Sequence, residues 1–191
     1  RYSFIGLPAE KKIEVWGDIV TLFKKKEVID KVCCDPLNFV EDYISKFSPS
    51  PEVYELPRFC GGLAGYFGYD VVRLVEPKLG EHIRQKENNL LIPDILLLEV
   101  RDMIIFDNYT GELTLVVFAN PEESSAFQQA EKKLDLMEAS LSKTLIIPEL
   151  GGYEATEIFR RFSKEEFEKS VLKAKEYIFS GEVMQVVLGQ I

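Results

Sequence analysis

A glutamine in the middle of an apolar stretch is the residue of this sequence that most suggests chemistry. Residues 183–190 read VMQVVLGQ, a pattern that predicts a β-strand with Gln185 near its centre. In the pleat, Gln185 faces the same way as Val187 and Gly189, and the small glycine leaves space beside it. Burying a side-chain amide costs on the order of a few kcal/mol unless it is hydrogen-bonded. Gln185 therefore either contacts a ligand, or bonds to a neighbouring strand or to solvent at a sheet edge.

A glycine-rich stretch, GGLAGYFG at residues 61–68, is the second candidate for a binding role. Its spacing is neither GxGxxG nor GxxxxGK[ST], and neither Lys-Ser nor Lys-Thr follows it, so it does not predict a phosphate-binding loop. We favour the alternative, a strand whose glycines allow a neighbouring backbone to approach closely.

The remaining reactive side chains complete no active site. Cys33, Cys34 and Cys60 form no CxxC pair and are interpreted as reduced thiols of a cytoplasmic protein. His82 is the single histidine, which excludes a histidine-based metal centre and a Ser-His-Asp triad. We therefore expect no metal-ligand set in this chain.

The composition is that of an acidic globular protein. The 191 residues are 46% hydrophobic and 29% charged, and 23 Lys and Arg against 32 Asp and Glu give a formal net charge of -9. Such a chain lacks the basic surface that nucleic acids and anionic membranes attract. No apolar run approaches the ~18 residues of a membrane span. These features exclude nucleic-acid and membrane partners and favour a cytoplasmic location.

Strands and helices are both indicated along the chain. Strands are predicted at residues 2–7, 12–16, 19–23, 95–106 and 113–118. We interpret the first three of them as a β-meander. Helix starts are predicted from capping signals at Asp35-Pro36, at Asp70 and at Asn120-Pro121. The helical spacing of apolar residues after Asn120 predicts one apolar stripe on that helix, made of Phe127, Ala130, Leu134, Met137 and Leu141.

The last helix has the clearest boundaries. Ser163 and Glu166 predict a capping box at its start, and Gly181 is placed to end it. Its expected buried stripe is Phe167, Val171, Ala174 and Ile178. The mixture of hairpins and helices predicts an α+β fold, with mixed or antiparallel sheets and packed helices. The sequence starts at Arg1 and stops at Ile191 inside strand-like runs, so we expect a piece of a longer protein.

Three segments, in this order, resemble anthranilate synthase component I. They are RYSFIG at residues 1–6, GGLAGYFGYDVVR at residues 61–73 and FEKSVLKAKEYIFSGEVMQVVLGQ at residues 167–190. The resemblance covers nearly the whole chain. It implies an amino-terminal domain at residues 1–145, a connector at 146–162 and the truncated start of the chorismate-utilising domain at 163–191. The fold would then be an incomplete piece of that family's α/β sandwich.

The resemblance implies a magnesium-dependent lyase of tryptophan biosynthesis. In that family ammonia, supplied from glutamine by a partner amidotransferase subunit, adds to chorismate, and pyruvate leaves to give anthranilate. The Mg²⁺ ligands and the groups that bind chorismate's carboxylates belong to later motifs that this sequence does not contain, so we expect the chain alone to be inactive. Tryptophan is implied as a feedback effector, with Arg1, Tyr2 and Ser3 forming one wall of its site.

The comparison gives Gln185 an expected catalytic role. In the isochorismate- and salicylate-forming relatives the matching position is a lysine that acts as general base on water, and ammonia needs no such base because it already carries a lone pair. Gly189 and Ile191 depart from the family's common Ser and Arg. Two alternatives stay open: 4-amino-4-deoxychorismate synthase component I, which shares the glutamine, and a non-catalytic regulatory or subunit-contact module.

Overall fold

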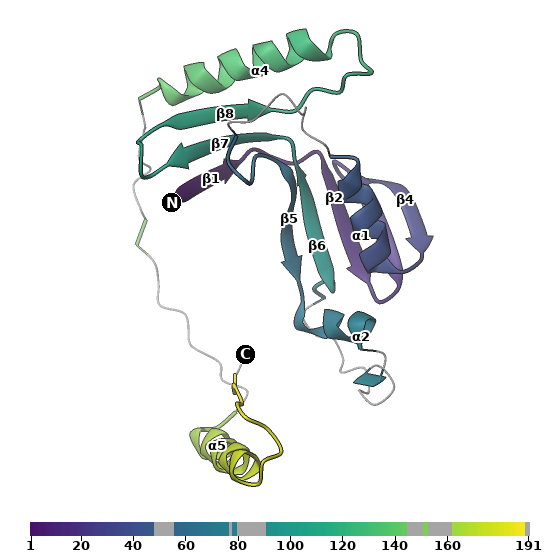
Figure 1. Cartoon of the computed structure of the whole chain (residues 1–191), viewed down its shortest axis with the longest axis vertical. Helices are drawn as coiled ribbons and strands as arrows, with labels where there is room; N and C mark the ends of the chain where they lie inside the picture. Colours follow the sequence, from purple (N-terminus) through teal and green to yellow (C-terminus); the bar gives the residue numbers. More distant parts are fainter. Residues whose placement is uncertain (48–55, 77, 80–90, 145–150, 153–161, 190–191) are drawn as a thin grey trace. The chain divides into compact units, whose positions relative to one another are not determined.

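A computed structural model of the chain describes residues 1–47, 56–76, 78–79, 91–144, 151–152 and 162–189. The chain divides into two compact units, Arg1–Thr144 and Leu145–Ile191. All the strand pairs described in the first unit are antiparallel, and helices accompany both of its sheets (Figure 1). The predicted α+β class with antiparallel sheets is confirmed.

The smaller sheet of the first unit has three strands in the order β1-β7-β8. These strands are β1 (Tyr2–Gly6), β7 (Asp102–Asp107) and β8 (Leu113–Val117). Helix α4 (Ala126–Leu141) runs alongside β8 (Figure 1). The buried cluster of this part of the unit is Val100, Met103, Ile105 and Val116.

The larger sheet has five strands in the order β4-β3-β2-β6-β5. They are β2 (Lys11–Trp16), β3 (Ile19–Lys24), β4 (Glu27–Cys33), β5 (Gly62–Phe67) and β6 (Ile95–Val100). Helix α1 (Pro36–Ser45) packs on one face through Leu37, Phe39, Val40 and Tyr43, over the buried cluster of Ile13, Val15, Val20, Ile95 and Leu97.

Two strand predictions are wrong, the single strand at 95–106 and the meander of the first three strands. In both places the chain moves from one sheet to the other where a single sheet was expected. The predicted strand 95–106 is two strands, and Arg101 is the residue between them. β6 pairs with β2 and β5, whereas β7 pairs with β1 and β8. The predicted meander fails because β1 pairs with β7 rather than with β2; the meander is β2, β3 and the unpredicted β4.

The glycine-rich stretch forms a strand, as predicted. In β5, a Cβ atom on Gly65 would overlap the backbone carbonyl oxygen of Leu96 on the neighbouring strand β6. The backbone N–H of Gly68 donates to the carbonyl of Asp94 at 2.7 Å. Glycine at residue 65 therefore allows the close approach of two backbones, which is the role that the spacing suggested.

The predicted helix starts have mixed outcomes in the first unit. Asp35 caps α1 as expected, because its Oδ1 accepts from the backbone N–H groups of Leu37 and Asn38. Asp70 is not a helix cap. It lies within a 3₁₀ turn, η1 (Tyr69–Val71), ahead of the short helix α2 (Val72–Val75), and its carboxylate pairs with Arg73 at 2.5 Å.

Helix α4 begins later than the sequence predicts. Asn120 Oδ1 accepts from the N–H of Glu122 at 3.2 Å, and its carbonyl accepts from Glu123, so the capping signal closes a turn and the helix itself starts at Ala126. Phe127, expected in the apolar stripe, is 76% exposed, whereas Ala126 and Met137 are buried. The later start places Ala126, rather than Phe127, on the face toward the sheet.

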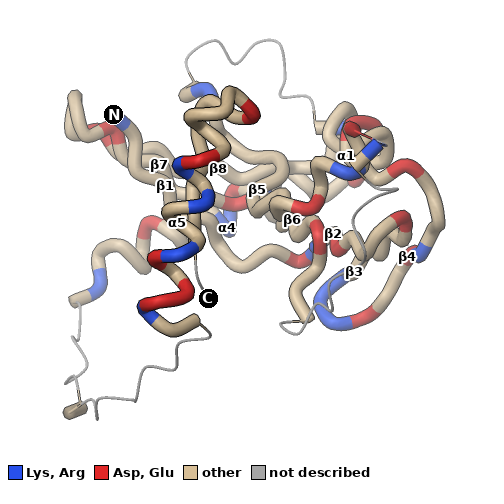
Figure 2. The backbone as a smooth tube through the Cα atoms, turned by 90° about the horizontal axis from the view of Figure 1, so that it is seen from below, with Lys and Arg blue, Asp and Glu red and all other residues tan. Residues whose placement is uncertain are grey.

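The second unit contains helix α5 (Lys164–Phe179) with its predicted boundaries. The capping box of Ser163 and Glu166 is present, and Gly181 follows the helix end with φ 80°. Both acidic and basic residues are distributed along α5 (Figure 2). Residues 183–189, however, form no strand, because nothing in the described part of this unit pairs with their backbone. The expected buried stripe is only partly covered, and Ile178 is exposed.

Replacing Gly65 by alanine is expected to destabilise the first unit. The added methyl group meets a backbone carbonyl that cannot rotate away, so strand β5 must separate from β6, at a cost of about 1–3 kcal/mol or more. Urea unfolding followed by circular dichroism measures the effect. Gly6→Ala is the matched control, because a Cβ at this strand glycine makes an ordinary 3.6 Å contact with Val100 Cγ1. Equal unfolding midpoints for the two variants would contradict the proposed close approach.

Candidate functional site

Arg1, the first of the predicted effector-wall residues, contacts the end of β7 and the hairpin loop that follows it. Its Nη2 donates to Asp107 Oδ2 at 2.8 Å, and its Nε donates to the same oxygen at 3.1 Å. The guanidinium carbon lies 5.0 Å from the ring centre of Tyr2 and 5.7 Å from that of Tyr109. The hydrogen bond from Arg1 lowers the pKa of Asp107 to about 2. Partial burial of the carboxylate acts in the opposite direction and raises the pKa, but its effect is smaller.

Ser3 takes part in the same anchorage. The side-chain amide of Asn108 donates to Ser3 Oγ at 3.1 Å and to the Arg1 carbonyl at 2.8 Å. Thus Arg1, Tyr2 and Ser3 lie together at the start of β1, with polar and aromatic neighbours from the end of β7 and the loop that follows it. The arrangement fixes the chain start against β7; its predicted role in binding tryptophan stays a prediction.

Gln185 lies in the second unit, in the irregular segment after α5. Its side chain is exposed and makes no hydrogen bond to another described residue. The apolar side chains around it are also exposed, with Met184 98% accessible. The predicted catalytic glutamine therefore has, within the described residues, neither the paired strand nor the polar neighbours that would orient its amide.

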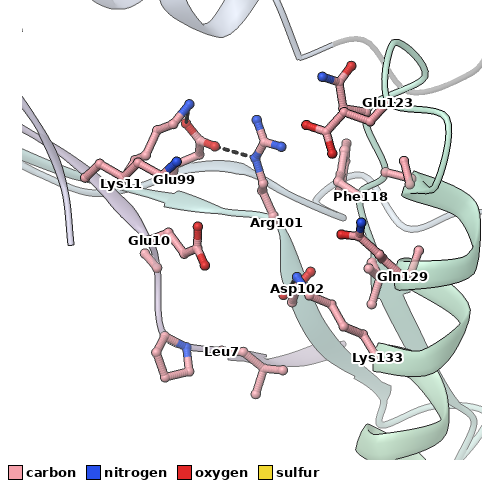
Figure 3. A pocket seen from close by; sticks show the side chains of 18 residues that line it. Leu7, Glu10, Lys11, Glu99, Arg101, Asp102, Phe118, Glu123, Gln129 and Lys133 are labelled. Carbon is pink, nitrogen blue, oxygen red and sulfur yellow. Dashed lines mark hydrogen bonds and ion pairs between the residues drawn. The ribbon is translucent and has the colours of Figure 1, made fainter. Parts of the chain in front are cut away.

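A charged cavity that the sequence reasoning did not predict lies where the chain passes from β6 to β7. It has a volume of about 390 Å³ (Figure 3). Five segments line it: the connection from β1 to β2, the end of β3, the β6–β7 junction, the end of β8 with the turn after it, and the first turns of α4. The available signal was the interruption of an apolar run by Glu99, Arg101 and Asp102, which placed polar side chains at the change of sheet.

Glu99 holds this junction together as a buried carboxylate. Its side chain is only 4% exposed and accepts hydrogen bonds from the Tyr43 hydroxyl and from Arg101 Nε, while Lys11 Nζ lies 3.7 Å away. Burial, together with the hydrogen bond to Glu99, raises the pKa of the Tyr43 hydroxyl, so Tyr43 stays a neutral donor. Since Tyr43 belongs to α1 and Glu99 to β6, the contact also links the helix to the sheet.

Asp102, on the other side of Arg101, pairs with α4. Lys133 Nζ donates to Asp102 Oδ2 at 2.8 Å, whereas Oδ1 is buried and has no hydrogen-bond partner among the described residues. The two acidic residues that flank Arg101 therefore attach the junction to both helices that accompany the sheets.

The described parts of the chain contain neither a group of metal ligands nor a cysteine with a lowered pKa. No group of three His, Cys, Asp or Glu side chains there could hold a metal ion, and His82 lies outside the described residues. The cysteines are free, as predicted, and a hydrogen bond to Asp18 raises the pKa of the Cys33 thiol, which disfavours the reactive thiolate. None of the helices in the described segments has the length and hydropathy of a membrane span.

The anchorage of Arg1 is expected to depend on pH. Asp107 has a pKa lowered from 3.8 to about 2, so the ion pair stabilises the fold fully above pH 4 and less as the pH falls toward 2. Arg1→Gln should therefore lower the thermal midpoint at pH 7, and the difference from wild type should shrink between pH 4 and pH 2. Arg58→Gln is the matched control, since Arg58 is exposed. A difference that stays constant with pH, or equals the control's, would contradict this assignment.

Comparison with known proteins adds a family to this geometry. A family model described as chorismate binding enzyme matches residues 11–190. Anthranilate synthase component 1 of Neisseria gonorrhoeae is 36% identical over 192 residues, which are 100% of this chain and 39% of that protein. The Pseudomonas putida protein of the same name is 39% identical over 197 residues, again 100% of this chain and 39% of the relative. The chain thus spans about two fifths of these relatives' length.

A solved structure supports the fold. The crystal structure of anthranilate synthase component I from Streptococcus pneumoniae TIGR4 superimposes with a TM-score of 0.68 and 24% sequence identity, over 95% of this chain and 39% of that chain. At this identity the likeness concerns the fold alone. The family model, in contrast, spans both sheets apart from β1, together with α1, α4 and α5. The chain belongs to the family of chorismate binding enzymes.

Proposed function

We propose that this chain is the amino-terminal part of an anthranilate synthase component I, which converts chorismate and ammonia to anthranilate and pyruvate in tryptophan biosynthesis. The observation that carries the proposal is the 36% and 39% identity, along the entire chain, to proteins of that name. Because the chain spans 39% of those relatives, the activity is proposed for the longer protein.

A partner subunit and an effector belong to the same proposal. The relatives' name, component 1, supports a second component, which we propose to be an amidotransferase subunit that supplies ammonia from glutamine. Tryptophan is the proposed effector, with Arg1, Tyr2 and Ser3 on one wall of its site. The two aromatic rings beside the Arg1 guanidinium support a site of this type, because they offer apolar surface next to a fixed charge.

The described residues of this chain contain no group of His, Cys, Asp or Glu side chains that could bind the proposed Mg²⁺. The exposed, unpaired Gln185 segment likewise lacks neighbours there. We therefore propose that the chain by itself forms no anthranilate and that, alone, it is a non-catalytic module. The groups that stabilise charge on the departing hydroxyl would come from the further length that the relatives have.

Gln185 is the proposed catalytic residue of the longer protein. The amide is not basic and can only orient a nucleophile, and ammonia is already competent because it has a lone pair. A lysine at this position could instead act as a base, since a desolvated pocket lowers the pKa of a lysine amine. Glutamine therefore fits amination of chorismate and disfavours addition of water. The product separates this proposal from 4-amino-4-deoxychorismate synthase, which shares the glutamine.

The experiment compares the full-length protein with its Gln185→Lys variant, using chorismate, ammonium and Mg²⁺, with the products separated by chromatography. We expect anthranilate from the wild type, none from residues 1–191 alone, and a loss of about ten- to a hundred-fold in rate for the variant. Gln128→Lys is the control, because Gln128 is exposed on α4. Absence of anthranilate from the full-length wild type would refute the function, and an unchanged rate and product for Gln185→Lys would refute the residue's role.

A further inference from the structure

The cavity at the β6–β7 junction is not used by the proposed reaction. All the residues that line it belong to the first unit, and it lies past the end of β1, at Leu7–Lys11, rather than at the Arg1 end. It contains an arginine whose position is fixed and carboxylates that are not paired, which makes it a candidate binding site in its own right.

Arg101 presents a hydrogen-bonding edge to this cavity. Its Nε is used by Glu99, which is itself held by Tyr43, and the guanidinium carbon lies 5.7 Å from the ring centre of Phe47. The two terminal nitrogens have no hydrogen-bond partner among the described residues, and the side chain is 44% exposed. Figure 3 shows the guanidinium pointing into the open space. A fixed guanidinium with free N–H groups is suited to bind a carboxylate.

The cavity also offers negative charge. Four basic and four acidic residues line it, namely Lys11, Lys24, Arg101, Lys133, Glu10, Glu99, Asp102 and Glu123. Glu99 and Asp102 are paired as described above, whereas the carboxylates of Glu10 and Glu123 make no ion pair or hydrogen bond with another described residue. A simple anion would meet these two carboxylates as like charges, so the lining favours a ligand that carries both signs.

Glu123 is the carboxylate better placed to take the ligand's positive charge. Glu10 has Lys11 as its neighbour in sequence, and Lys24 lies opposite Lys11 in the strand register, so cations already surround it. The segment that contributes Glu123 to the lining, residues 117–126, contributes no basic residue. In Figure 3 the Glu123 carboxylate and the Arg101 guanidinium face the same space from opposite segments.

An apolar groove adjoins the cavity. It has a volume of about 370 Å³ and shares Leu7, Asp102 and Lys133 with the cavity; its remaining lining is Ile104, Leu136, Met137, Ser140 and Leu141. A ligand with a charged head in the cavity can therefore extend an apolar chain between α4 and β7.

We propose that this cavity binds a small amphipathic zwitterion of the amino-acid type, with its carboxylate on Arg101 and its ammonium group on Glu123. The site stands on the first unit alone and needs neither chorismate nor the rest of the proposed enzyme. It also accounts for the fixed geometry of Arg101, whose Nε is committed to Glu99 so that the terminal nitrogens remain available.

Three probes with matched apolar bodies test the proposal on the 191-residue chain: norvaline, valerate, which lacks the ammonium group, and butylamine, which lacks the carboxylate. Titrations follow the Arg101 Nε–Hε resonance by NMR. We expect saturable binding of norvaline, at least about fivefold tighter than that of either half-molecule, because both charges are then paired. Equal affinity for norvaline and valerate would show a plain anion site and would overturn the proposal, as would the absence of any saturable shift.

Glu123→Gln assigns the ammonium contact. The variant should lose the preference for norvaline while its affinity for valerate is retained or improved, because one negative charge has been removed. Glu122→Gln is the matched control, since Glu122 is the adjacent exposed glutamate and does not line the cavity. Both glutamates are exposed, so neither variant is expected to unfold the protein. If the two variants bind norvaline equally well, Glu123 is not the ammonium ligand and the proposed site is wrong.

Discussion

An extended segment becomes a β-strand only where neighbouring strands accept and donate its backbone hydrogen bonds, and this requirement organises the whole chain. In the first unit β6 and β7 are central strands of two different sheets, each with partners on both sides. The chain can pass between the sheets at one residue, Arg101, because β6 and β7 each have pairing partners on both sides. In the second unit, residues 183–189 have strand-like sequence but no described partner, and they form no strand.

The junction at Arg101 also holds one of the two buried carboxylates described in the first unit, that of Glu99; the other belongs to Asp107. Glu99 connects β6 to α1 through Tyr43 and to the junction through Arg101, while Asp102 connects β7 to α4 through Lys133. A buried carboxylate is tolerable only when donors surround it, and removing one donor leaves an uncompensated charge. The change of sheet and the polar cavity are therefore two aspects of one arrangement, in which polar residues occupy the place where neither sheet can continue.

Local signals predicted the parts of the fold that depend on short-range physics. The cap at Asp35, the capping box at Ser163 and the close approach at Gly65 each depend on a few adjacent atoms, and all three are present. Pairing was not predictable in this way. The apolar run 95–106 reads as one strand because sequence periodicity does not state which partner each half will have, and β1 was assigned to its neighbour in sequence for the same reason.

The candidate site shows the same division. Gln185, from the strand pattern, and the Arg1–Ser3 segment, from the resemblance, stay predictions as site residues. The structure places Arg1 against Asp107, a residue more than a hundred positions away that no sequence pattern connected to it. The cavity at Arg101 was missed because its lining comes from five separated segments. Composition and spacing describe neighbours along the chain, whereas a cavity is made by neighbours in space.

Hydrogen exchange of the amides of residues 183–189 tests the central claim, that this strand-like segment has no pairing partner in the described part of this chain and forms a strand only where neighbouring strands pair with it. In the isolated 191-residue chain these amides should exchange at nearly the rate of an unstructured peptide, while those of Ile95–Val100 are protected by pairing on both sides. In the full-length protein, residues 183–189 should become protected as well. Protection of this segment in the isolated monomer, equal to that of Ile95–Val100, would contradict the account.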